Sequence, residues 1–167
     1  MSLNESSLFD RDYKTFKNFG QENMLSLNEV FKESMRTVQL RFSHMNIIIR
    51  CQSLPHIAGN GEEIRKLFDE LLTMLFSSTL VGSRLFLYVD CEEENSDAID
   101  LSLSQGFKRY QIRFHTNITT KENWKDVNSQ VLAVCQQILS CHHGSFLVNS
   151  NNKTGCLFSI SLPGKLQ

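Results

Sequence analysis

Cysteine and histidine side chains gather near the C-terminal end of the chain, where Cys135 is followed by Cys141, His142 and His143. Thiolates and imidazoles are zinc ligands, and a cysteine close to a histidine is also the arrangement of a nucleophilic pair. The spacing matches no usual zinc pattern, and no third group is placed to orient a Cys–His pair. We therefore expect no metal site and no catalytic residue in this cluster.

The overall composition is that of a folded domain, and its net charge favours no charged class of partner. Of 167 residues, 41% are hydrophobic, and the formal net charge is −1. That charge gives no reason to expect nucleic-acid binding, and no apolar run approaches ~18 residues, so we expect no membrane insertion in this segment. No signal sequence is visible at the start. An odd number of cysteines without a disulfide-like framework fits reduced thiols, which predicts a cytoplasmic location.

Three stretches have the apolar spacing of amphipathic helices, at about 27–44, 62–78 and 127–141. Ser26 or Asn28 is a suitable N-cap for the first helix. Glu62 and Glu63 lie in the first turn of the second, where the helix dipole favours acidic side chains. The polar stretch 116–126 before the third helix is expected to be a loop.

Strands are expected between and after these helices, at 45–51, 55–58, 84–91, 99–104, 109–115, 145–149 and 156–162. The first is a β-branched run typical of a buried strand. In the third, Leu85, Leu87 and Val89 share one face. Gln105-Gly106 predicts a hairpin between 99–104 and 109–115, and the last two strands form a second hairpin.

This order of elements predicts an α+β fold, a two-layer sandwich in which a mixed sheet carries three helices on one face. The domain is expected to occupy residues 25–167. Residues 1–24 are polar with scattered aromatic side chains, and we interpret them as an N-terminal extension or linker stub.

The stretch 128–163 reads NSQVLAVCQQILSCHHGSFLVNSNNKTGCLFSISLP. It resembles the C-terminal part of the ATP-binding domain of sensor histidine kinases. The family pattern there is Gly-Leu-Gly-Leu-Ala-Ile, a helix, His-Gly-Gly, a strand, Gly-x-Gly and a strand ending in Leu-Pro. The helix, the turn His142-His143-Gly144 and the ending at Leu162-Pro163 all fit. The similarity extends over about 25–163, and it implies the histidine kinase-like ATPase fold of the gyrase, chaperone, kinase and MutL superfamily.

The metal-binding motif of that family is altered in this chain. The family helix carries Asn-Leu-Leu-x-Asn-Ala, and its second Asn holds Mg²⁺ against the triphosphate. The matching stretch here begins at Glu70 and places Met74 at the second Asn. A thioether is a poor ligand for this hard ion, which takes oxygen. The resemblance to the gyrase-like branch gives Glu70 a second interpretation as the base that activates water, beside the simpler one of a helix carboxylate.

The adenine and phosphate motifs are altered as well. The family's Asp-x-Gly-x-Gly should follow the strand that ends near residue 114, but the residues there are His-Thr-Asn-Ile-Thr. The glycines that allow backbone N–H groups to approach the phosphates are replaced by Ser129 and Val131. We expect Met74 and Val131 to fill part of the former cleft. The positions matching the family's nucleotide pocket, at which no nucleotide binding is expected, are Glu70, Thr73, Met74, Ser77, Thr116, Asn117, Ser129 and Val131.

The resemblance and the altered motifs together predict a degenerate, non-catalytic ATPase domain, a pseudokinase-like interaction or regulatory module in two-component-type signalling. A response regulator or a kinase would be its protein partner. Trp124 is either a contact for that partner or a local anchor of its own loop. No cofactor is expected. Two alternatives stay open: a divergent but active ATP-binding domain of a sensor histidine kinase, which alone would need ATP and Mg²⁺, and a docking domain of a histidine phosphotransfer protein.

Overall fold

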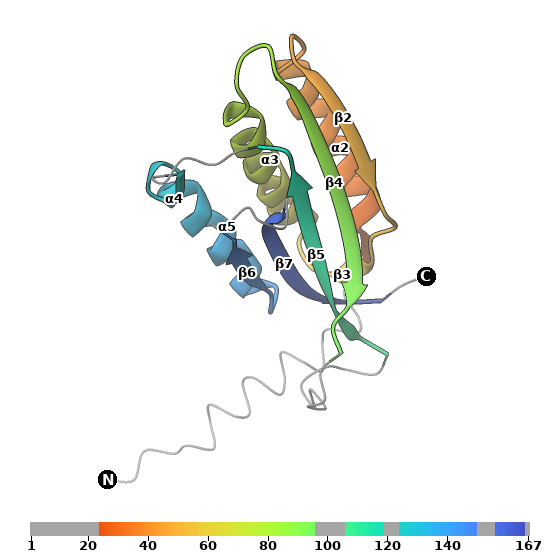
Figure 1. The fold of residues 1–167 in the computed structure, drawn as a ribbon. Helices are drawn as coiled ribbons and strands as arrows, with labels where there is room; N and C mark the ends of the chain where they lie inside the picture. Colours follow the sequence, from red (N-terminus) through yellow and green to blue (C-terminus); the bar gives the residue numbers. More distant parts are fainter. Residues whose placement is uncertain (1–23, 96–105, 119–123, 150–155, 166–167) are drawn as a thin grey trace, which may run out of the picture.

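The computed structural model describes residues 24–95, 106–118, 124–149 and 156–165. Within these ranges the chain forms two sheets and four helices (Figure 1). The strands are β1 (Met24–Ser26), β2 (Asn46–Cys51), β3 (His56–Ala58), β4 (Arg84–Glu93), β5 (Lys108–Thr116), β6 (Ser145–Val148) and β7 (Cys156–Gly164). The helices are α2 (Leu27–Arg41), α3 (Gly61–Ser77), α4 (Trp124–Val127) and α5 (Ser129–Cys141).

The main sheet has five strands in the order β2-β4-β5-β7-β6. β2 runs parallel to β4, and α3 lies between them in the chain, whereas every other neighbouring pair is antiparallel. A parallel pair needs a crossover connection of this length, while antiparallel neighbours do not. The sheet is therefore mixed, as the sequence predicted. β1 and β3 form a separate two-stranded ribbon.

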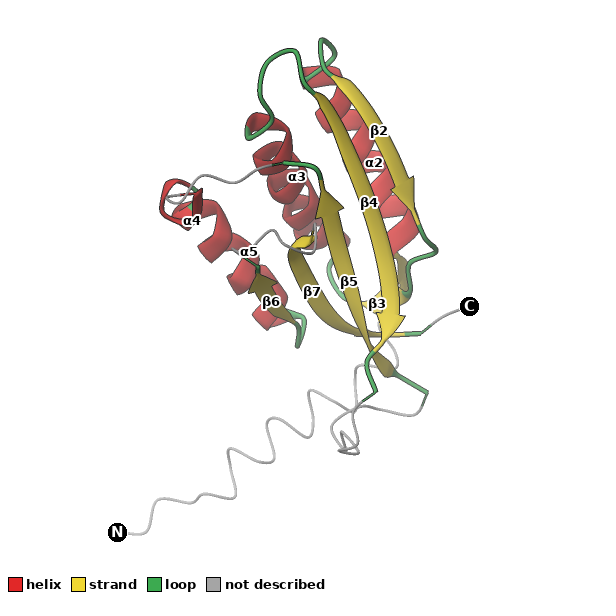
Figure 2. Cartoon of the chain, in the orientation of Figure 1, coloured by secondary structure: helices red, strands yellow, loops and turns green. Residues whose placement is uncertain are grey.

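Helices α2, α3 and α5 pack on one face of the main sheet and leave the other face open (Figure 2). Strand residues of one parity, such as Leu87, Val89 and Phe114, are fully buried between the layers. Aromatic side chains from both layers meet there: the ring of Phe31 on α2 lies 5.5 Å from that of Phe68 on α3. The two-layer α+β sandwich expected from the sequence is confirmed.

Local chemistry explains where the first two helices begin. The Ser26 hydroxyl accepts a hydrogen bond from the backbone N–H of Glu29, and the Asn60 side chain accepts from the N–H groups of Glu62 and Glu63. These bonds satisfy N–H groups that have no partner within the helix. Of the two caps proposed for α2, the structure uses Ser26, while Asn28 instead bonds both backbone groups of Leu54.

The third expected helix differs from the prediction. Instead of one helix over 127–141, a single turn, α4, is followed by α5, and Asn128 between them has non-helical backbone angles. The described residues thus contain four helices rather than three, and the extra one lies in the stretch 116–126 that was expected to be a loop. That stretch also includes Thr116, the last residue of β5. The Asn128 side chain makes no cap hydrogen bond, so the sequence carries no strong signal for this break.

The strand expected at 45–51 is present, but its burial differs from the prediction. The β-branched run at β2 forms an edge strand with alternating exposure, not a buried one, because β4 is its single neighbour in the sheet as described. The expected strand at 99–104 and the residue Gln105 lie outside the described residues. The strand after them, β5, pairs with β4 and β7. Residues 1–23 also lie outside, so the boundary near residue 25 stays a prediction.

Candidate functional site

The eight positions matched to a nucleotide pocket come from three elements. Glu70, Thr73, Met74 and Ser77 lie on the C-terminal half of α3, Thr116 and Asn117 at the end of β5, and Ser129 and Val131 at the start of α5. α3 packs directly against α5, and all three segments lie toward the same end of the molecule (Figure 1). The fold therefore places these positions in one region, although their side chains point in different directions.

Met74 faces the interior of the protein. Its side chain is 4% exposed and belongs to the hydrophobic core. Thr73 is half-buried and Ser77 is exposed on the same helix. The position at which the resemblance implies a metal-binding amide is thus occupied by an apolar side chain that helps to hold α3 in place.

Glu70 lies near α5. Burial raises the pKa of the Cys135 thiol to about 12, and the negative charge of Glu70 contributes to the increase. Cys135 is fully buried on α5, so the carboxylate of Glu70 is close to the interface between the two helices. Glu70 itself is half-buried. Its place at this interface agrees with either interpretation of its role.

The polar side chains at the end of β5 bond to the protein's own backbone. The Asn117 amide accepts from the N–H of Phe86 (2.9 Å) and donates to the carbonyl of Arg84 (2.8 Å), which prolongs the pairing of β5 with β4. The Thr116 hydroxyl accepts from the N–H of Ile118 (3.0 Å), and Ile118 is buried in the core. Asn117 also lines a pocket on the open face of the sheet, so the structure does not direct it toward the helix-side positions.

The start of α5 presents side chains where the family pattern has glycines. Val131 is half-buried and packs against the core, and Ser129 is exposed. A Cβ at each position occupies space that a glycine would leave beside the first backbone N–H groups of a helix. Met74 and Val131 thus place apolar side chains at two of the eight positions, both on the side of the sheet that the helices cover.

His142 fixes the junction of α5 and α3. Its ring is 5% exposed; Nδ1 lies 2.8 Å from the carbonyl oxygen of Ile138, and Nε2 accepts from the backbone N–H of Asn60 at 3.1 Å. A carbonyl can only accept, so the ring is the neutral Nδ1–H tautomer. The carboxylate of Glu63, 3.8 Å from Nε2, is then not an ion-pair partner. His142 is a structural connector, and no group of three or more metal-binding side chains occurs within the described ranges.

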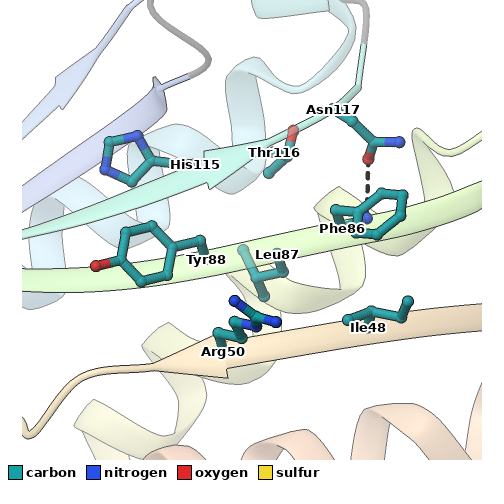
Figure 3. Close-up of a pocket in the computed structure, with 8 residues that line it drawn as sticks. All are labelled: Ile48, Arg50, Phe86, Leu87, Tyr88, His115, Thr116 and Asn117. Atoms are coloured by element: carbon teal, nitrogen blue, oxygen red, sulfur yellow. Dashed lines mark hydrogen bonds between the residues drawn. The ribbon is translucent and has the colours of Figure 1, made fainter.

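A large pocket lies on the opposite side of the sheet, and of its lining residues only Thr116 and Asn117 were among the positions expected from the sequence. It is a groove of about 780 Å³ over β2, β4 and β5, lined by Ile48, Arg50, Phe86, Leu87, Tyr88, His115, Thr116 and Asn117 (Figure 3). The signal in the sequence is the alternation in β4, where Phe86 and Tyr88 occupy positions that face away from the helices. A sheet face in contact with water normally carries polar side chains at such positions.

Comparison with known proteins gives the fold a name. No family model matches the chain. It is 24% identical over 140 residues to the heme sensor protein HssS of Staphylococcus saprophyticus; the match covers 82% of this chain but about 30% of HssS.

Several solved structures share the fold. The mycobacterial sensor histidine kinase MprB aligns with a TM-score of 0.61 at 14% identity, over 87% of this chain and all of that one. The catalytic domain of histidine kinase ThkA aligns with 0.59 at 15% identity, over 86% and 95%. Acinetobacter baumannii AdeS, also a histidine kinase, aligns with 0.55 at 12% identity, over 96% and 79%. The chain has the histidine kinase-type ATPase fold. In the described part of the chain, no helix is long and apolar enough to cross a membrane.

Proposed function

We propose that this domain is a degenerate histidine kinase-type ATPase domain that does not bind Mg²⁺-ATP and acts as an interaction or regulatory module in two-component-type signalling. The observation that carries this proposal is the burial of Met74 in the core. The resemblance implies a metal-holding Asn at this position, and the side chain present is 4% exposed and has no oxygen.

The residues present do not fit the metal. Mg²⁺ requires oxygen ligands in near-octahedral geometry, and a buried thioether offers none. Replacing Met74 by a polar residue would remove core packing and bury a polar group, so we expect such a change to destabilise the fold.

The residues present do not fit the nucleotide either. Asn117 is engaged by the backbone of β4, and Ile118 next to it is part of the core. Val131 places a branched side chain at the start of α5. Phosphoryl transfer depends on positioning a metal–nucleotide complex, and we assign no catalytic residue here.

The first alternative, a divergent but active ATP-binding domain, is favoured by one observation. Glu70 lies at the α3–α5 interface, close enough for its charge to raise the pKa of Cys135. The gyrase-like interpretation assigns Glu70 the role of the base, and its place at this interface is compatible with that role. A Glu70→Gln variant that abolished ATP hydrolysis would establish this alternative.

The partner that we propose is a protein of the signalling system, a response regulator or a kinase, and the location that we propose is the cytoplasm. The solved structures that share the fold include sensor histidine kinases, which supports this class of partner in general. The HssS match covers about 30% of that protein, so the domain is proposed to work as part of a larger signalling system.

Thermal unfolding with and without nucleotide tests the proposal. A ligand at about 100 times its Kd stabilises the folded state by about 2.7 kcal/mol, which raises the Tm of a domain of this size by more than about 5 °C. We expect about 2 mM Mg²⁺-ATP to leave the Tm unchanged, so that any site present is weaker than about 20 μM. A histidine kinase domain that binds ATP is the positive control. A shift that saturates with ATP concentration would contradict the proposal.

A further inference from the structure

The groove on the open face of the sheet combines apolar side chains with solvent exposure. Ile48 on β2 is 39% exposed, and Phe86 and Tyr88 on β4 are 45% and 40% exposed. All three stand on the side of the sheet away from the helices (Figure 3). Large apolar side chains grouped on a surface mark sites of interaction, whereas single ones do not.

The charge around this groove is positive. Arg50 lines it, and Arg84 precedes Phe86 by two residues on the same face of β4. Neither arginine is in an ion pair within the part of the chain that the structure describes.

The nearby acids already have partners. Asp90 is held by Arg113 at 2.7 Å and lies 2.8 Å from Nε2 of His115, and Glu92 pairs with Arg113 at 2.7 Å. These carboxylates therefore do not neutralise Arg50, and the groove favours an anionic ligand.

Among the described residues, the outer edge of β2 beside the groove has no strand partner. β2 is the end strand of the main sheet and pairs with β4 along one side. A segment that adds along the other side of β2 would extend the sheet, and every second side chain of that segment would point to the face that carries the groove.

We propose that this groove and the free edge of β2 form a docking site for an acidic, aromatic-bearing segment of a partner protein, which adds as a strand beside β2. Backbone hydrogen bonds to β2 supply affinity, an aromatic or aliphatic side chain packs against Ile48, and a carboxylate pairs with Arg50. The inference rests on the proposed function in that the domain acts through protein contacts. It does not depend on whether ATP binds, since the docking contacts are Ile48, Arg50 and the edge of β2, and none of these is among the eight positions matched to the nucleotide pocket.

A defined peptide tests the site. The probe is fluorescein-labelled Glu-Phe-Asp-Leu-Glu with blocked ends, and its charge-reversed counterpart is Lys-Phe-Lys-Leu-Lys. Fluorescence anisotropy with the full chain should show saturable binding of the acidic probe and at least tenfold weaker binding of the basic one. Arg50→Gln should weaken the binding of the acidic probe by about tenfold, which is the effect expected from the loss of one charged pair. The matched control is Arg36→Gln, which removes the same charge from an exposed position on α2 and should leave binding unchanged.

Hydrogen exchange provides the second readout. Bound probe should slow exchange at the backbone amides of β2, because strand addition gives them new partners. The proposal is overturned if the acidic probe does not saturate, if Arg50→Gln and Arg36→Gln bind it equally, or if β2 exchange does not change.

Binding of a different occupant in the groove would also overturn the docking proposal. Light scattering that shows a dimer disrupted by Ile48→Lys would assign the groove to a second copy of the chain. Tighter competition by a synthetic peptide of residues 5–20 would assign it to the chain's own N-terminal segment. Saturable ATP binding would overturn the proposed loss of nucleotide binding but leave the peptide result standing, so the two failures are distinguishable.

Discussion

At the scale of single residues, Met74 shows that a core side chain stands where the family resemblance implies a metal ligand. Met74 is buried on α3, while Ser77 one turn later is exposed. Burial of an apolar side chain at this position contributes about 1.5–3 kcal/mol to the stability of the folded state. The residue present at position 74 thus contributes to stability.

Glu70 is the residue whose role is open to a direct test. If it is a half-buried carboxylate without a catalytic role, Glu70→Gln should change the free energy of unfolding by no more than about 0.5 kcal/mol and leave partner binding intact. Urea unfolding measures the first, and a binding assay the second. A larger loss of stability would show that the carboxylate is structurally required at the α3–α5 interface.

Because of Cys135, the free energy of unfolding should decrease as the pH rises in the alkaline range. Burial, then the charge of Glu70, raises the thiol pKa from 9.0 to about 12 in the folded protein. The folded state therefore keeps its proton while the unfolded state loses it, so this contribution to stability is complete below pH 9 and is lost as the pH rises toward 12. The loss approaches about 1.4 kcal/mol per pH unit above pH 9. Urea unfolding at pH 8 and pH 10 should show a smaller decrease in Cys135→Ala than in the wild type. Equal decreases would contradict the assignment.

At the scale of elements, His142 couples the end of α5 to the start of α3. A Cβ built on Gly59 would lie against the His142 ring, 2.8 Å from Nε2. Gly59→Ala should therefore destabilise the domain by about 1–3 kcal/mol, as overpacking does.

The histidine variant supplies the control for that prediction. His142→Ala should also destabilise the domain, because it removes a buried ring and leaves the Asn60 N–H without its acceptor. In that background Gly59→Ala should cost at least about 0.5 kcal/mol less than in the wild type, since the clashing partner is gone. Additive effects of the two changes in urea unfolding would show that the residues do not interact.

The elements differ in how well the sequence predicts them, and the reason is physical. Local chemistry predicts the cap at Ser26 and the alternation in β4, and both agree with the structure. The break between α4 and α5 at Asn128 has no local cap signal, and the edge position of β2 depends on the order of strands distant in the sequence. The side chains of Phe86 and Tyr88 alternate as a strand requires, but only the sheet order shows that Ile48 lies beside them on an uncovered face.

Some features of the candidate site can likewise be predicted from the sequence, and others require the structure. Residue identity alone indicates that Met74 is a poor Mg²⁺ ligand. The hydrogen bonds of Asn117 to β4 and the nearness of Glu70 to Cys135 require the folded arrangement of β5, α3 and α5. The sequence could therefore identify the altered motifs, and the structure adds what the replacement side chains do.

At the scale of the whole molecule, the proposed role in partner contact can be tested at Trp124. Trp124 begins α4, and its side chain lies outside the described part of the structure. If it is a partner contact, Trp124→Ala should abolish a pull-down with the response regulator or kinase while the Tm barely changes, because one buried indole carries a large share of an interface's energy. A loss of several degrees with partner binding intact would assign Trp124 to internal packing.

Direct titration of nucleotide tests the central claim, that the fold is retained without its nucleotide site. Mg²⁺-ATP is titrated into the full chain in a calorimeter, with a histidine kinase domain that binds ATP as the positive control. With Met74 in the core, Asn117 bonded to β4 and Val131 at the start of α5, we expect no saturable heat up to about 1 mM ATP, a limit near −4 kcal/mol of binding free energy. A Kd in the micromolar range would contradict the account.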